Sequence, residues 1–212
     1  MKTKLIDNNS NELIIFLSGW GCDDIQFKNM ESSKDVLICW DYTDLDFKFD
    51  FTGYEKYYLI AYSAGVFISG LIEAKLPKTE IKIAINGNPL LTDDYFGIPQ
   101  NIRQIFKDLN INNYMDFRKK YLVKTDKELE YFNQNASQRS FESCKKEIEK
   151  LEEYALNNKK IPNFDYAILS DCDKIFNPSH QREYFKEKYK SLKNTAHNVF
   201  CYFRNFDDIL NF

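Results

Sequence analysis

The sequence of 212 residues lacks the features that mark membrane and secreted proteins. Its longest stretch without a charged residue, residues 57–72, has 16 residues and contains two Ser and two Gly. A membrane-spanning helix needs about 20 mostly apolar residues, so we expect no membrane span. The start, MKTKLIDNNSNE, contains no apolar core of the kind that a secretory signal carries.

Histidine is scarce, and cysteine follows no metal-binding pattern. Only His180 and His197 are present, and none of the five cysteines forms a CxxC pair, so the sequence predicts no metal site. An odd number of cysteines without an export signal indicates reduced thiols in the cytoplasm. The 29 basic and 32 acidic residues give a net charge of −3, which gives no reason to expect nucleic-acid binding.

The material for one packed domain is present. Apolar residues make up 43% of the chain and aromatic residues 16%, which excludes global disorder. A single core usually serves chains of up to about 250–300 residues, so we expect one domain over residues 1–212. By default we also expect a monomer.

Short apolar runs alternate with helical or loop segments. Such runs lie at residues 13–17 (LIIFL), 36–40 (VLICW), 57–61 (YYLIA), 81–85 (IKIAI) and 166–169 (YAIL), and a last strand is expected around residues 189–192. Continuous apolar runs are typical of strands buried on both faces. Residues 64–74 have the apolar spacing of a helix. The pattern predicts an α/β fold with a mostly parallel sheet and helices on both faces.

Residues from about 100 to 160 interrupt this alternation and contain helical patterns only. The predicted helices cover residues 101–111, 113–123 and 140–158. Residues 101–160 have a net charge of +3, whereas the rest of the chain has a net charge of −6. We interpret this stretch as a helical cap inserted into the domain. By default its charges favour a solvated helix face with i,i+4 pairs over a binding surface.

Ser63 lies where a nucleophile elbow would lie, in Ala61-Tyr62-Ser63-Ala64-Gly65 between a predicted strand and a predicted helix. The G-x-S-x-G pattern needs small residues on both sides of the serine, and Ala61 replaces the first glycine here. At a helix N-terminus the Ala64 N–H would face negative charge on a bound carbonyl oxygen. The alternative is a serine in an ordinary turn, acting as a helix cap.

Serine needs an imidazole to take its proton and a carboxylate to orient that imidazole. In α/β-type serine hydrolases the chain order is Ser, acid, His, with the acid after a late strand. Ser63, Asp173 and His197 satisfy this order, although Asp171 follows the same strand. His180 lies in a segment typical of a helix cap and first turn, which favours His197 as the base.

These residues, with others along most of the chain, resemble the BioG family of pimeloyl-[acyl-carrier protein] methyl ester esterases. The resemblance rests on five segments: MKTK and the Gly-Trp-Gly turn at 19–21; D-Y-x-D-L at 41–45; A-Y-S-A-G-V at 61–66; A-I-N-G at 84–87 with G-I-P at 97–99; and A-H-N-V-F at 196–200. Tyr62 replaces a tryptophan of the family pattern, and Ala196 replaces a proline.

The resemblance implies an α/β-hydrolase-like fold in which Ser63 is the nucleophile and His197 the general base, with Asp173 assigned as the acid mainly from chain order. By analogy with related hydrolases, the N–H groups of Trp20 and Ala64 would form the oxyanion hole. It implies hydrolysis of the methyl ester of pimeloyl-acyl carrier protein in biotin synthesis, with no cofactor or metal. The carrier is acidic, which makes basic residues of the cap candidates for binding it: Arg103, Lys107, Arg118, Lys119, Lys120 and Arg139.

Two other functions fit the same sequence. The first is a general hydrolase of small esters or thioesters without a carrier partner, because the triad fixes the reaction while the pocket fixes the substrate. The second is a catalytically inactive scaffold that binds a partner through the cap. The chain order of Ser63, Asp173 and His197 argues against the scaffold.

Overall fold

The apolar runs form the centre of one sheet in the computed structural model, which describes residues 1–158 and 160–212. Its strand order is β1-β3-β2-β4-β5-β6-β7. The strands are β1 (Lys2–Ile6), β2 (Glu12–Leu17), β3 (Asp35–Trp40), β4 (Lys56–Tyr62), β5 (Ile81–Ile85), β6 (Tyr166–Ser170) and β7 (Tyr189–Leu192). Strands β2 to β7 are parallel, and β1 pairs with β3 in the antiparallel direction.

The predicted strands are confirmed to within one residue at each end, and the α/β architecture with them. Strand β1 was not predicted. Its sequence, KTKLI, lacks an apolar run because an edge strand faces solvent, and Lys4 there pairs with Asp24. None of the helices in the described part of the chain is long and apolar enough to cross a membrane.

Alternate side chains of the central strands point to opposite faces of the sheet and enter two separate cores. On one face, Leu13, Ile15 and Leu17 pack with helix α1 (Ala64–Leu71) and helix α6 (Pro178–Phe185). On the other face, Ile14 and Phe16 pack with three short helices: η1 (Asp24–Phe27), η3 (Phe200–Tyr202) and α7 (Phe206–Leu210). Both faces are therefore covered, as expected. A further short helix, η2 (Glu73–Lys75), follows α1.

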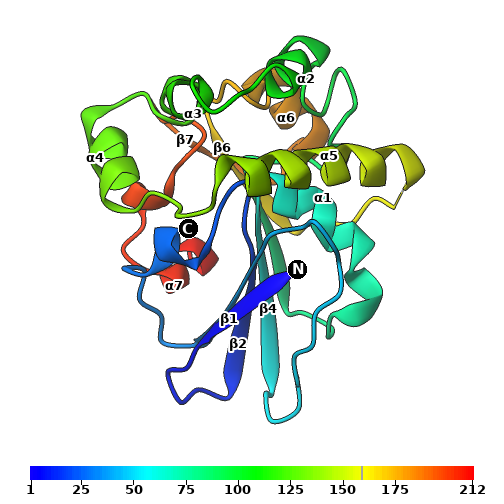
Figure 1. Ribbon diagram of the computed structural model, residues 1–212. Coiled ribbons are helices and arrows are strands. Elements are labelled where there is room, and N and C mark those ends of the chain that lie inside the picture. The colour runs from blue at the N-terminus through cyan, green and yellow to red at the C-terminus, as the bar shows by residue number, and fades with distance from the viewer. Residues whose placement is uncertain (159) are drawn as a thin grey trace.

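Four helices occupy the interval where the cap was expected: α2 (Gln100–Lys107), α3 (Tyr114–Leu122), α4 (Asp126–Gln134) and α5 (Phe141–Asn157). Figure 1 shows them together at one end of the sheet. The sequence pattern predicted three of them and missed α4. The missed helix begins with a capping box, in which Thr125 accepts the Glu128 N–H and the Glu128 side chain returns to the Thr125 N–H. This T-x-x-E signal was available in the sequence.

Candidate active site

Ser63 lies between the end of β4 and the start of α1 in a strained backbone conformation, with φ 54° and ψ −120°. Its amide donates to the Ile85 carbonyl across the sheet. A Cβ on Gly65 would lie 2.3 Å from the carbonyl oxygen of Leu17, and a Cβ on Gly87 would lie 2.4 Å from that of Ser63. Only glycine fits at these two positions. The tight packing holds the serine in the conformation of a nucleophile elbow.

His197 joins Ser63 to Asp173. The distance from His197 Nε2 to Ser63 Oγ is 2.9 Å, and that from Nδ1 to Asp173 Oδ2 is 2.8 Å. With the ring proton on Nδ1, the imidazole donates to the carboxylate and accepts from the hydroxyl. The other carboxylate oxygen, Oδ1, accepts the backbone N–H groups of Ile175 and Phe176. All three side chains are buried, so these hydrogen bonds form in a low-dielectric environment.

The competing candidates point elsewhere. Asp171 accepts the Thr195 N–H and the Cys172 thiol, and its carboxylate makes no hydrogen bond with His197. His180 stacks on Tyr95 and bonds to the Tyr95 carbonyl at an exposed position. The structure therefore brings Asp173, and not Asp171, to the imidazole.

The turn after β2 packs directly against the serine. A Cβ on Gly19 would lie 2.9 Å from the Tyr62 ring and 3.1 Å from Ser63 Cβ, and Gly21 has a φ of +68°. The indole N–H of Trp20 donates to the Cys144 carbonyl on α5 at 2.6 Å. In the described part of the chain, no hydrogen bond occupies the backbone N–H of Trp20 or of Ala64. Both amides are thus free to bind a carbonyl oxygen.

A buried carboxylate on α5 fixes this turn. Glu147 is fully buried and accepts hydrogen bonds from the N–H groups of Gly21, at 2.9 Å, and Tyr42, at 2.8 Å. It also pairs with Arg139 at 2.6 Å, and Arg139 reaches Asp41 at 3.1 Å. Burial alone would raise the pKa of Asp41, but Lys2 and Arg139 overcome this and hold that pKa below its usual value. The Lys/Glu-rich pattern of α5 gave no sign that Glu147 is buried.

A second buried carboxylate supports the histidine. Glu128 of α4 accepts the N–H of Ala196, immediately before His197, at 2.8 Å, and also bonds to Tyr202. The next amide, Asn198 N–H, donates to the Leu122 carbonyl at the end of α3. The cap therefore contacts the chain on both sides of His197.

Tyr62 and Asn86 complete the support of the histidine from within the sheet domain. The Tyr62 hydroxyl and the Asn86 amide both donate to the His197 carbonyl, at 3.3 and 2.8 Å. Asn86 also bonds to Ser170 at the end of β6. Both residues lie in segments that resemble the BioG family, but the sequence gave no signal for these contacts.

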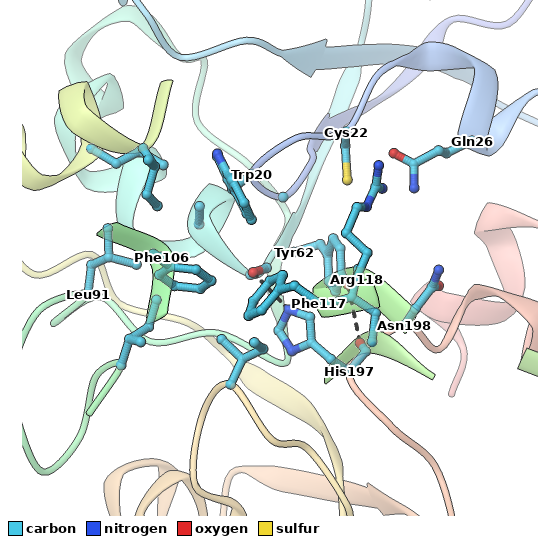
Figure 2. A pocket seen from close by; sticks show the side chains of 18 residues that line it. Trp20, Cys22, Gln26, Tyr62, Leu91, Phe106, Phe117, Arg118, His197 and Asn198 are labelled. Atoms are coloured by element: carbon cyan, nitrogen blue, oxygen red, sulfur yellow. Dashed lines mark hydrogen bonds between the residues drawn. The ribbon is translucent and has the colours of Figure 1, made fainter. Parts of the chain in front are cut away.

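Ser63 and His197 lie in a pocket between the sheet and the cap (Figure 2). Most of the lining is apolar and comes from both parts of the chain: Trp20, Leu91, Ile98, Phe106, Phe117, Leu122, Ile148, Leu151 and Ile175. A smaller group of polar side chains also lines it: Cys22, Gln26, Arg118 and Asn198. Burial raises the pKa of the Cys22 thiol to about 12, so this cysteine remains protonated. The pocket suits an apolar chain with a polar group near the serine.

The six basic residues predicted to bind a carrier do not form one surface. Lys107, Lys119 and Lys120 are exposed on the cap, and Arg103 is paired with Asp94. Two of the predictions need correction. Arg118 is only 4% exposed and lines the pocket. The Arg139 side chain is 5% exposed and forms ion pairs with two carboxylates, those of Asp41 and Glu147. Lys119 and Lys120 follow Arg118, and Gln138 and Ser140 flank Arg139, so the pattern gave no sign of burial.

Comparison with known proteins places the chain in one family. The family model for BioG, pimeloyl-ACP methyl esterase, matches residues 1–209. The crystal structure of BioG from Haemophilus influenzae has a TM-score of 0.88 at 28% identity, covering 98% of this chain and 99% of that one. A malonyl-[acyl-carrier protein] O-methyltransferase from Bacteroides fragilis is 32% identical over 178 residues, which are 81% of this chain but 36% of that longer protein.

More distant structures share the fold alone. A bromoperoxidase from Bacillus anthracis has a TM-score of 0.66 at 14% identity, and the match covers 99% of this chain and 93% of that one. Together with the seven-stranded sheet, such neighbours confirm the α/β-hydrolase-like fold expected from the sequence.

Proposed function

Because the chain belongs to the BioG family of pimeloyl-ACP methyl esterases, we propose that it hydrolyses the methyl ester of pimeloyl-acyl carrier protein through Ser63, His197 and Asp173. The observation that carries this proposal is the hydrogen-bonded chain from Ser63 Oγ through His197 to Asp173, at 2.9 and 2.8 Å, on a largely apolar pocket. The reaction is ester hydrolysis with methanol as the leaving group.

Ser63 Oγ attacks the ester carbonyl while His197 Nε2 takes the hydroxyl proton. Asp173 stabilises the imidazolium that forms. The N–H groups of Trp20 and Ala64 bind the negative oxygen of the tetrahedral intermediate. His197 then gives its proton to the departing methoxy oxygen, which leaves an acyl-enzyme and methanol.

Water completes the cycle by the same route in reverse. His197 removes a proton from the water as it attacks the acyl-enzyme carbonyl, and returns the proton to Ser63 Oγ as the ester bond breaks. The product is the free carboxylic acid. These steps use no metal ion or cofactor.

An acidic carrier protein is the proposed partner, and the exposed lysines of the cap are the proposed contact. Lys119 and Lys120 lie together at the end of α3, whereas Arg103 already has an acidic partner. Exposed cations of this kind steer an acidic partner and lose effect as salt is added. Lys107 is a weaker candidate, since Glu152 lies 3.9 Å from its ammonium group.

The test of the reaction compares wild-type protein with Ser63→Ala on pimeloyl-acyl carrier protein methyl ester, followed by mass. The wild type should remove about 14 Da, the mass of one CH₂, and the variant should leave the substrate intact. Cleavage of a simple methyl ester by Ser63, without cleavage of the carrier-linked ester, would instead support the general hydrolase. No cleavage of either, with no labelling by a covalent serine probe, would support the scaffold.

The test of the carrier contact reverses charge with Lys119→Glu and Lys120→Glu together. The measured quantity is the turnover of the carrier-linked ester divided by that of a free methyl ester. At low salt this ratio should be about tenfold or more lower in the double variant than in wild type, and added salt should bring the two ratios closer together. Lys146→Glu, an exposed lysine of α5, is the matched control. An unchanged ratio in the double variant would refute the contact.

A further inference from the structure

Arg118 is an arginine inside the pocket. It belongs to α3, is only 4% exposed and lines the same cavity as Ser63 and His197. Figure 2 shows its side chain extending toward Cys22 and Gln26, away from the cluster that contains Leu91 and Phe106. The cavity therefore has an apolar side and one end that carries a guanidinium group.

This guanidinium lacks the partners that a buried charge normally has. In residues 1–158 and 160–212, no ion pair and no hydrogen bond involves the Arg118 side chain. Its neighbours are the rings of Tyr114, 5.6 Å from the guanidinium carbon, and Phe132, at 5.3 Å. Cation–π contacts of this kind offset only part of the cost of removing an arginine from water, and arginine does not lose its proton.

Arg139 shows how this chain treats a buried arginine with a structural role. Its side chain is 5% exposed, close to the exposure of Arg118, yet it pairs with both Glu147 and Asp41. Arg118 has no such carboxylates and faces a cavity instead. A guanidinium that is almost fully buried, faces a cavity and has no anionic partner in the described part of the chain indicates a site for an anionic ligand.

We propose that Arg118 forms a subsite that binds the carboxylate of an acyl-chain acid. The planar guanidinium fork matches a carboxylate, and one such group supplies the single negative charge that the pocket lacks. Methylene groups of the chain would lie along the apolar side, against Leu91, Phe106 and Leu151. The identity of the acid rests on the proposed function, because ester hydrolysis at Ser63 releases a carboxylate in this same cavity.

Binding of the acid has a consequence for catalysis. An enzyme with this subsite binds its acid product more tightly than a neutral chain of the same length, so the acid competes with the ester substrate. Arg118 then slows the release of the acid product.

The test measures binding directly, by calorimetry, so that it does not depend on turnover. Heptanoate and its neutral analogue heptanamide are titrated into wild type, Arg118→Met, Arg118→Lys and Arg204→Met. The wild type should bind heptanoate about tenfold or more tightly than the amide, as expected for hydrogen bonds to a charged group. Arg118→Met should lose this preference, and Arg118→Lys, which lacks the fork, should retain only part of it. Arg204→Met removes an exposed arginine and should keep the full preference.

Three results would overturn the proposal. Equal binding of the acid and the amide to wild type would do so even where Arg118→Met fails to fold. A carboxylate preference that persists in Arg118→Met would place the anion elsewhere, at the amides beside Ser63. Displacement of heptanoate by millimolar inorganic phosphate would indicate a phosphate site instead. A failure of the proposed esterase reaction is recognised separately, because turnover and heptanoate binding are measured independently. Ser63→Ala should abolish turnover and keep the preference for heptanoate over the amide.

Discussion

Replacing Glu147 by glutamine should destabilise the protein and also slow ester hydrolysis. Glu147 is fully buried and accepts three hydrogen bonds, from Gly21 N–H, Tyr42 N–H and Arg139. A glutamine has nearly the same shape but only one accepting oxygen, and its NH₂ group would face donors. At least one amide loses its acceptor, and Arg139 keeps Asp41 alone as a charged partner.

The size of the effect follows from these contacts. Removing one partner of a buried ion pair costs about 3–5 kcal/mol of unfolding free energy. For a chain of this length that corresponds to a fall in melting temperature of roughly 6–20 °C. The Gly21 amide adjoins Trp20, so a displaced turn moves the proposed oxyanion donor. Loss of one such donor lowers kcat by about 10²–10³.

The assay follows thermal unfolding and, well below the melting temperature, the hydrolysis of a soluble methyl ester. Glu149→Gln, an exposed glutamate two residues further along α5, is the matched control and should change neither quantity appreciably. A Glu147→Gln protein that melts within about 2 °C of wild type would contradict this expectation, since breaking a buried ion pair should have a larger effect. Lower stability with an unchanged kcat would refute only the link to the oxyanion hole and would leave the predicted loss of stability intact.

Two further predictions concern the elbow and the C-terminal helix. Gly65→Ala places a Cβ against the Leu17 carbonyl oxygen, 2.3 Å away in the native backbone, so it should abolish esterase activity; wild-type activity in a soluble Gly65→Ala protein would contradict this. Burial would raise the pKa of Asp207, but Ser33 and Lys34 hold that pKa below its usual value. This group therefore stabilises the fold above its unfolded pKa, about 3.9, and the stabilisation is lost as pH falls through the folded value. In urea titrations Asp207→Asn should be about 1–2 kcal/mol less stable than wild type at pH 6, with a smaller difference at pH 3; a pH-independent difference would refute the assignment.

The sequence predicted the parts of the fold that depend on local pattern. Strands β2, β3 and β4 are buried on both faces. Such strands need apolar residues at successive positions, so they are recognisable in the sequence as continuous apolar runs. Strand β1 pairs through its backbone at the sheet edge, where its side chains face solvent, so its composition carries no such signal. Ser63 was singled out as a candidate because the turn of a nucleophile elbow needs small residues within two positions of the serine.

The sequence could not reveal what holds the site together. Glu147 lies 126 residues from the Gly21 amide that it binds, and Glu128 lies 68 residues from Ala196. In sequence, each is one more acidic residue on a charged helix, for which a solvated position is the usual outcome. Arg118 was misread for the same reason. Its neighbours Lys119 and Lys120 are exposed, and in a helix of about 3.6 residues per turn, residues one or two positions apart lie on different faces.

The cap is a structural part of the candidate active site and not merely a cover over it. Its helix α5 fixes the Gly19–Trp20–Gly21 turn through Glu147 and the Cys144 carbonyl. Its helices α3 and α4 hold the amides on either side of His197. The sheet supplies the serine and the aspartate, whereas the turn at residues 19–21 and the amides beside the histidine are bound by the cap. A cap movement that breaks these contacts would therefore also release the groups proposed to do the chemistry.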